Sequence, residues 1–401
     1  MFDANFFSGN RSRLIESLPE GVVVAIAGHG QLQRNGSNTY DFRQDSSFWY
    51  LSGLVEPDLV LIFSAERELV LLPKRDASYR TFNGEIKIEE LVRNSGIPTF
   101  IEADWAKGLK SELADAKCIF SLLPIAPYIS QAGIYVNPAR QRLGSVLNEV
   151  LPKHQIEDIR PHLGRLRMIK QPIELAAVKQ ACDITTAAFE SIKNALPTFK
   201  SEAEILRAVK SEMFRAGADD MAYSPIAAAG DSSTVLHYHL HNRQISKHDL
   251  ILIDAGAEKN FYASDITRTY SVSSPTTRQQ AVHAAVIAIQ KQALNLLKPG
   301  LNLKDYEKAV RDFAAGQLAT LGLKTDELSI KKYFPHSTSH YLGLDVHDSG
   351  DYGQLHTGVV LTVEPGIYIP EEALGVRVED NVVITDSGYD NLTAALNKEL
   401  Y

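Results

Sequence analysis

Four carboxylates and a histidine in the last third of the chain have the residue types and spacing of a two-metal hydrolase site. Asp254 and Glu364 each end an apolar run, and Asp265 and Glu379 each stand shortly before a later apolar run. Four acids gathered in a dry core would repel one another strongly, because burial and like charge both disfavour the ionised form. Divalent cations that take carboxylate and imidazole ligands would remove this repulsion.

Histidines lie between and before the two pairs of acids. His336, His340 and His347 fall in one short segment beside small residues and a glycine, which suggests a loop folded around a site. A second cluster alternates with the period of a β-strand, so that His237 and His239 would face one side of it. We expect at least one of these two to line the same site.

The acids also have an ordinary interpretation as solvated turn residues, because most Asp and Glu side chains are exposed. This interpretation suits Glu371 and Glu372, which lie in the middle of the second predicted turn. It suits Asp254 poorly, since four aliphatic residues precede it directly. Taken together with the histidines, the acids predict a metal site.

Strands and turns must position these acids. Each pair would have its first acid on a strand, a turn that contains Gly256 or Gly366, and its second acid on the return strand. Because cross-strand neighbours lie within about 5.5 Å, the two acids of a pair can be adjacent across a hairpin. The two hairpins form a faint internal repeat, and two such hairpins facing one another would bring four carboxylates to one point.

Long amphipathic helices accompany the hairpins. Helices are expected over about 171–196, 201–217, 277–299 and 303–321, with capping boxes at Ser201-x-x-Glu204 and Thr277-x-x-Gln280. Helices that pack on antiparallel strands form an α+β layer arrangement.

The first part of the chain alternates short apolar runs with helical segments, which predicts an α/β unit. Strands are expected over 22–27, 48–51, 59–63, 69–72 and 118–123, and helices over 86–94 and 138–150. Short continuous apolar runs suit a sheet that is buried on both faces. A charged segment at 156–170 marks a boundary, so we expect domains 1–160 and 161–401.

Composition excludes several classes of protein. The length of 401 residues favours two domains or one large one. A net charge of −8 without a basic stripe argues against nucleic acid as a partner. No apolar stretch approaches the roughly 20 residues of a membrane span, and the first residues lack the apolar core of a secretion signal. The two cysteines lie far apart, which is typical of the reducing cytoplasm.

Five segments resemble the motifs of the proline-specific metallopeptidases of the creatinase, aminopeptidase P and prolidase family. They are residues 252–257, 264–269, 340–348, 362–368 and 376–381. Residues 40–53 look like the N-terminal motif of aminopeptidase P, so that the resemblance covers nearly the whole chain. One departure is Ser337, where many members have glycine. The resemblance implies an α/β creatinase-like N-terminal domain and an α+β pita-bread C-terminal catalytic domain.

The resemblance also implies a ligand set for two divalent metal ions. Asp254 would chelate one ion, Asp265 and Glu379 would bridge both, and His340 and Glu364 would complete the shell of the other. Manganese is the usual ion in this family, and cobalt or zinc can take its place. An oxygen-rich site of this kind suits Mn²⁺ better than a thiolate site would.

A mechanism follows from this ligand set. Two ions roughly 3.5–4 Å apart can hold a bridging hydroxide at neutral pH, which would attack the carbonyl carbon of an Xaa–Pro bond. Glu364 would carry the proton. His347 would hydrogen-bond the developing oxyanion, which is the electrostatic contribution that usually dominates. His237 and His336 would shape the subsite for the proline ring. His237 would also be a catalytic residue, and His347 would also bind substrate.

Two more residues are expected at the site. Arg377 would share a strand face with Glu379 and support a ligating carboxylate, which makes it a further catalytic candidate. Its alternative interpretation is an exposed strand arginine. Tyr368 would bind substrate, and its alternative interpretation is a packing residue.

Several activities remain open within this resemblance. Aminopeptidase P would release Xaa from Xaa-Pro-peptides, whereas prolidase would accept only Xaa-Pro dipeptides. A methionine aminopeptidase would not carry this N-terminal domain, and creatinase-like enzymes and non-catalytic pita-bread binding modules usually lack the ligands. The N-terminal motif favours aminopeptidase P. Members of the family are commonly homodimers or homotetramers.

Overall fold

The computed structural model of the chain describes residues 2–122, 129 and 133–401. The chain divides into two compact units, Met1–Leu166 and Arg167–Tyr401. Cys118 and Cys182 are free thiols. None of the helices in the described ranges is both long and apolar enough to cross a membrane.

The N-terminal unit is built on a six-stranded mixed sheet with the strand order β6-β5-β4-β1-β7-β8. Its strands are β1 (Val23–Ala27), β4 (Val60–Phe63), β5 (Glu68–Leu72), β6 (Thr99–Glu102), β7 (Cys118–Ser121) and β8 (Gln155–Asp158). The predicted strands in this unit are confirmed for β1, β4, β5 and β7, although residue 123 lies outside the described residues. Apolar side chains of the sheet pack against α5 (Trp105–Leu113) and α7 (Ala139–Val150).

The remaining N-terminal elements are short. They are α1 (Ala4–Glu16), α2 (Ser46–Ser52), α3 (Ala77–Asn83), α4 (Ile88–Ser95) and the hairpin of β2 (Gln33–Asn35) and β3 (Asn38–Thr39). The strand predicted over 48–51 is wrong, because these residues belong to α2. Asp45 caps this helix by accepting hydrogen bonds from the backbone N–H groups of Ser47 and Phe48, and Gly53 ends it with φ 67°. Every residue of α2 is buried, so that no polar face revealed the helical period.

The C-terminal unit consists of two halves with the same order of elements, two long helices followed by a strand, a short hairpin and a return strand. The first half contains α9 (Pro172–Ala195), α10 (Glu202–Arg215), β11 (Leu250–Ala255), β12 (Ala257–Lys259), β13 (Tyr262–Ala263) and β14 (Ile266–Ser271). The second half contains α11 (Thr277–Leu296), α12 (Leu303–Thr320), β15 (Val360–Val363), β16 (Gly366–Ile369), β17 (Leu374–Arg377) and β18 (Asp380–Ile384). The predicted α+β layers are therefore confirmed.

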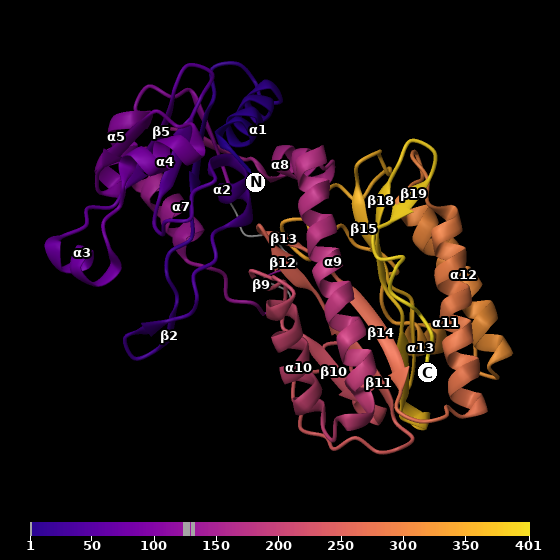
Figure 1. Cartoon of the computed structure of the whole chain (residues 1–401). Coiled ribbons are helices and arrows are strands. Elements are labelled where there is room, and N and C mark those ends of the chain that lie inside the picture. Colours follow the sequence, from indigo (N-terminus) through magenta and orange to yellow (C-terminus); the bar gives the residue numbers. More distant parts are fainter. Residues whose placement is uncertain (1, 123–128, 130–132) are drawn as a thin grey trace. The chain divides into compact units, whose positions relative to one another are not determined.

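Helices lie on the outer sides of this unit, and the strands of the two halves face one another between them (Figure 1). Additional elements are β9 (Asp220–Met221), β10 (Ile226–Ala229), α13 (Glu327–Tyr333) and β19 (Tyr389–Asn391). Helix α8 (Arg160–Met168) includes the boundary between the two units. β11 pairs antiparallel with β14, and β15 pairs antiparallel with β18. The repeated element order predicted from the two hairpins is present in the structure.

Helix α11 begins at Thr277 as expected, but its capping box starts one residue earlier than predicted. Thr276 is the N-cap and forms a capping box with Gln279, whereas the sequence analysis placed the box at Thr277 and Gln280. Two adjacent threonines, each followed three residues later by glutamine, make the two registers hard to distinguish from the sequence.

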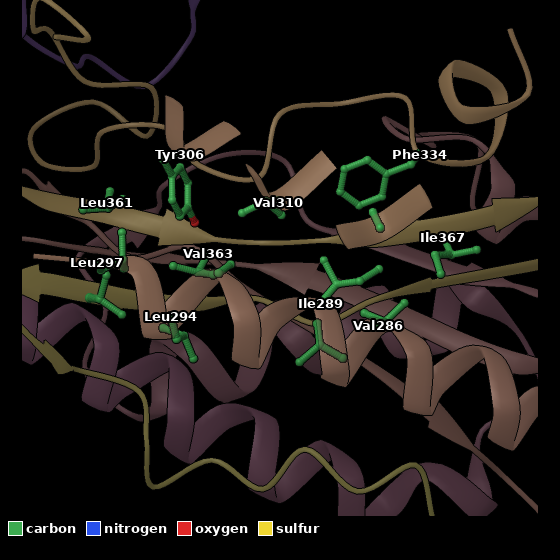
Figure 2. Close-up of a cluster of buried hydrophobic side chains, with 14 of the residues drawn as sticks. Val286, Ile289, Leu294, Leu297, Tyr306, Val310, Phe334, Leu361, Val363 and Ile367 are labelled. Carbon is green, nitrogen blue, oxygen red and sulfur yellow. The ribbon is translucent and has the colours of Figure 1, made fainter. Parts of the chain in front are cut away.

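A large apolar cluster supports the second half of this unit (Figure 2). Val286 and Ile289 of α11 are completely buried, as expected for residues that recur at helical spacing along one face. They belong to the same core as Val310 of α12 and Val363 of β15. This core fixes the helix layer against the strand that leads directly to Glu364.

Candidate metal centre

Strand register brings the first pair of acids together. Asp254 of β11 lies opposite Thr267 of β14, and Asp265 comes directly before β14. The acid pair is therefore diagonal across the ladder, and Asp265 stands at the end of the return strand instead of within it. The turn between them is a short hairpin. Gly256 is required at its start, because an added Cβ would collide with the carbonyl oxygen of Ser264.

The second pair has the same arrangement. Glu364 follows β15 directly and Glu379 precedes β18 directly, with the hairpin of β16 and β17 between them. The backbone N–H of Glu379 donates to the carbonyl of Thr267 at 3.0 Å, and the N–H of Asp265 donates to the Asn381 side chain at 2.9 Å. These bonds join the two return strands and place Asp265 beside Glu379.

Asp265, Glu379 and His340 form a cluster suited to a metal ion. Each offers one ligand atom, and these atoms all lie within 4.8 Å of one another. Nδ1 of His340 lies 3.0 Å from the Tyr341 carbonyl oxygen, which makes Nδ1 the protonated nitrogen. Nε2 is then free to bind a metal. It lies 3.5 Å from Asp265 and 3.3 Å from Glu364.

Asp254 lies beside the cluster of Asp265, Glu379 and His340 and is linked to it through Tyr223. Its Oδ1 accepts a hydrogen bond of 2.5 Å from the hydroxyl of Tyr223, which also contacts Asp265. Its Oδ2 lies 2.5 Å from Nη2 of Arg377. The arginine thus compensates the charge of this largely buried carboxylate.

Burial and mutual repulsion shape the electrostatics of the other acids. The pKa of Asp265 is raised well above its usual value by burial and then by Asp254. The pKa of Glu364 is raised by burial and by Glu379, and the pKa of Glu379 is raised by burial and by Asp265. Oε1 of Glu379 is buried and has no hydrogen-bond partner within the described residues. Such an acceptor, surrounded by like charges, fits a site for divalent cations.

A hydrogen-bonded chain runs from Asp254 to His336. Nη1 of Arg377 lies 2.8 Å from the hydroxyl oxygen of Tyr368, and that hydroxyl lies 2.8 Å from Nε2 of His336. Nδ1 of His336 lies 2.9 Å from the Ser337 carbonyl and 3.7 Å from Glu364. Burial and the nearby arginine lower the pKa of His336 to about 4, so that the ring is neutral.

The alternative interpretations of two residues can now be decided. Arg377 is 4% exposed, so that the exposed strand arginine is excluded. Tyr368 is both near the acids and packed, because its hydroxyl bonds Arg377 and its ring joins a small apolar cluster with Leu252.

His347 and His237 are the most open of the candidate residues, and both are exposed. The ring of His347 lies edge-on to His340 with centroids 4.3 Å apart. Desolvation lowers the pKa of the His347 ring most, and the neighbouring His340 and His237 lower it further. His237 also lowers the pKa of His336, so that it lies close enough to influence both.

The predicted strand around His237 is wrong. Residues 237–241 are outside the observed strands, and the buried residue there is Tyr238. Its hydroxyl donates to Glu202 at 2.7 Å, which holds this segment against α10. The alternation of histidines therefore reflects an anchored tyrosine between exposed neighbours, not a strand.

Tyr223 and Thr267 were missed by the sequence analysis. Thr267 accepts a hydrogen bond from Nε of Arg377 at 3.0 Å and donates one to Glu379 at 2.7 Å. Tyr223 lies shortly before β10, whose Ile226 pairs with Asp254. Neither role has a local signal, because each depends on a partner from a distant segment.

Comparisons with known proteins agree with this geometry. Residues 176–386 match the model of metallopeptidase family M24, and residues 7–119 match the N-terminal domain of aminopeptidase P. The Xaa-Pro aminopeptidase of Haemophilus influenzae is 33% identical, over 98% of this chain and 95% of its own. The Xaa-Pro aminopeptidase of Escherichia coli is 32% identical, over 98% of this chain and 95% of its own.

Solved structures show the same likeness. A glutamate-to-alanine variant of Escherichia coli aminopeptidase P in complex with substrate has a TM-score of 0.88 and 27% identity, covering 99% of this chain and 96% of that one. The zinc-substituted enzyme in complex with product has a TM-score of 0.88 and 28% identity, with the same coverage of 99% and 96%.

The chain belongs to metallopeptidase family M24. It combines a creatinase-like N-terminal domain with a pita-bread catalytic domain, as the resemblance implied. Divalent metal ions are the cofactors of this family, and the oxygen-rich cluster of Asp265, Glu379 and His340 suits them.

Proposed function

We propose that the protein is a Xaa-Pro aminopeptidase, which removes the first residue from peptides that have proline in the second position. The observation that carries this proposal is the cluster of Asp265, Glu379 and His340, flanked by Asp254 and Glu364. The likeness to Xaa-Pro aminopeptidases over nearly the whole chain supports it. We divide the chain into domains 1–160 and 161–401 and propose that the second domain is the catalytic one.

Five residues would hold two metal ions. Asp254 would chelate one ion, Asp265 and Glu379 would bridge both, and His340 and Glu364 would complete the other shell. Such ions lower the pKa of water and polarise a peptide carbonyl. We propose manganese as the native metal, since carboxylate ligands outnumber the single imidazole, with cobalt or zinc as substitutes.

Other residues of the chain would act directly on the substrate or hold the ligands. Glu364 would carry the proton between water and the leaving imide nitrogen, because a carboxylate beside the bound water can accept a proton and return it. His347 would donate a hydrogen bond to the oxygen of the scissile carbonyl. His237 and His336 would line the subsite for the proline ring.

Arg377 and Tyr368 would not contact the reacting atoms but would orient the residues that do. Arg377 bonds Asp254, Thr267 and Tyr368 at once, so that it orients a ligand instead of meeting the substrate. Tyr368 would keep His336 oriented through the bond between its hydroxyl and Nε2. The nitrogen of an Xaa–Pro bond carries no N–H, so the substrate offers no hydrogen-bond donor at this position. A subsite lined by histidine rings does not depend on such a donor.

Hydrolysis of defined peptides tests this proposal. Gly-Pro, Gly-Pro-Pro and a longer Xaa-Pro-peptide are incubated with Mn²⁺ and then with a chelator, beside matched peptides that carry alanine in place of the proline. We expect cleavage of the longer proline peptides, only with metal, and with release of the first residue. Cleavage of the dipeptide alone would make the protein a prolidase. Metal binding without cleavage of any of them would refute the proposal.

The cellular setting is part of the proposal. We infer a cytoplasmic protein that forms a homodimer or homotetramer and acts on free peptides, without nucleic acid or membrane as partner. Light scattering at several protein concentrations measures the oligomeric state, and a monomer at all of them would contradict the inferred assembly.

A further inference from the structure

A buried ion cluster lies next to the candidate metal centre, and the proposed reaction does not use it. The side chain of Asp348 is 1% exposed, and those of Arg167 and Lys170 are 3% and 0% exposed. Nζ of Lys170 lies 3.0 Å from Oδ2 of Asp348, and Nη2 of Arg167 contacts Oδ1. The same guanidinium lies 2.7 Å from Asp345. Buried charges persist only when such partners compensate them.

The two cations come from a firmly held stretch of backbone. Arg167 belongs to α8, and Lys170 directly precedes the capping box of α9 that Gln171 and Glu174 form. The backbone N–H of Lys170 donates to the carbonyl of Gly358 at 2.9 Å. The backbone around Lys170 is thus held by hydrogen bonds that do not involve the carboxylate of Asp348.

The carboxylate comes from residues 340–348, which we call the histidine loop. Asp348 closes this loop, because its backbone N–H donates to the Tyr341 carbonyl at 2.9 Å. The carbonyl of Gly343 accepts a bond of 2.8 Å from the N–H of Ala263, two residues before Asp265. The loop is therefore tied to the strand that leads into the metal centre.

Packing inside the histidine loop is tight around the ion cluster. A Cβ added at Gly343 would collide with Oδ2 of Asp348 and would lie 2.8 Å from Cε of Lys170. Oδ1 of Asp348 also accepts the backbone N–H of Ser349 at 2.9 Å. The carboxylate therefore holds the residue that follows it, and the backbone N–H of Asp348 holds the end of the loop next to His347.

We propose that Asp348 is a positioning residue for His347. Held between Arg167 and Lys170, its carboxylate fixes the end of the histidine loop, and this keeps the ring of His347 edge-on to that of His340. This inference rests on the proposed function, in which His347 donates to the scissile carbonyl. Rings held by packed and hydrogen-bonded neighbours keep the geometry that catalysis needs.

The first test is Asp348→Asn, which keeps the shape and one acceptor but removes the charge. We expect kcat for Gly-Pro-Pro to fall roughly 10–100-fold, as for other residues that support an active site, with KM and bound metal unchanged. The matched control is Glu68→Gln in the other unit, where Glu68 pairs with Arg11, an arginine that is 1% exposed. This control should lower Tm and leave kcat unchanged. A normal kcat in Asp348→Asn would overturn the proposal.

A double-mutant cycle separates positioning from general loss of structure. We expect Asp348→Asn to have little further effect on kcat in a His347→Ala background, because the group it positions is then absent. Losses that multiply, or loss of bound metal in Asp348→Asn, would show that Asp348 does not act through His347. If Asp348→Asn fails to fold, Lys170→Gln replaces it in the same cycle.

Failure of the proposed function gives a different pattern. A His347→Ala variant with a normal kcat would remove the catalytic role of His347 and the positioning role of Asp348 together. Absence of cleavage in the wild-type protein would refute the proposed activity before the cycle begins.

Discussion

Thr267 offers the sharpest test of how the metal centre is assembled. Its hydroxyl donates to Oε2 of Glu379 at 2.7 Å and accepts from Nε of Arg377 at 3.0 Å, and the residue is completely buried. Thr267→Val keeps the shape of the side chain and removes both bonds. The variant should still fold, since valine suits a strand interior.

The expected loss can be worked out from the hydrogen bonds of Glu379. Its Oε1 has no hydrogen-bond partner within residues 2–122, 129 and 133–401, so that the bond from Thr267 is the support of this carboxylate. A hydrogen bond to a charged group contributes about 1.5–3 kcal/mol. At roughly 1.4 kcal/mol per tenfold, Mn²⁺ affinity should fall about 10–150-fold if Glu379 is the bridging ligand proposed above.

Thr269→Val is the matched control, because Thr269 lies on the same face of β14 and is also buried. Its hydroxyl donates to the backbone carbonyl of Arg377 at 2.9 Å and accepts the backbone N–H of the same residue at 3.2 Å. Among the described residues, this hydroxyl has no hydrogen bond to a proposed metal ligand. Calorimetric titration of chelator-treated protein with Mn²⁺ should show weaker binding only for Thr267→Val. Equal affinities in the two variants would refute the reasoning.

Four further outcomes are expected. Asp265→Ala and Glu379→Ala should abolish peptide cleavage and release metal, and normal turnover in either would show that it is not a bridging ligand. His347→Ala should lower kcat about 10²–10³-fold with metal retained, as measured by elemental analysis. Ile289→Ala should reduce the free energy of unfolding by about 2–5 kcal/mol because this buried side chain leaves a cavity, while kcat at low temperature stays normal. Without metal, burial raises the pKa of Asp265, Glu364 and Glu379, so the folded state binds more protons than the unfolded state. Tm of chelator-treated protein should therefore fall as the pH rises above about 4, the usual pKa of an unfolded carboxyl group, and Mn²⁺ should abolish that fall.

Local patterns predicted much of the fold. Continuous apolar runs gave β1, β4 and β5, and caps at Gln171 and Ser201 gave the starts of α9 and α10. These signals are local because burial of a strand and capping of a helix depend on neighbouring residues. Residues 48–51 were misassigned because a completely buried helix has no polar face.

For the site, the sequence by itself determined which acids and histidines are present and that apolar strands lead to them. Asp254 stood out because no solvated turn explains an acid directly after four aliphatic residues. Only the tertiary structure decided how the acids are held. Tyr223, Thr267 and Asp348 received no role from the sequence, because each acts through a residue far along the chain. Thr267 meets Glu379 only because the two halves of the C-terminal unit pack together, and packing between distant segments leaves no periodic signal in a single sequence.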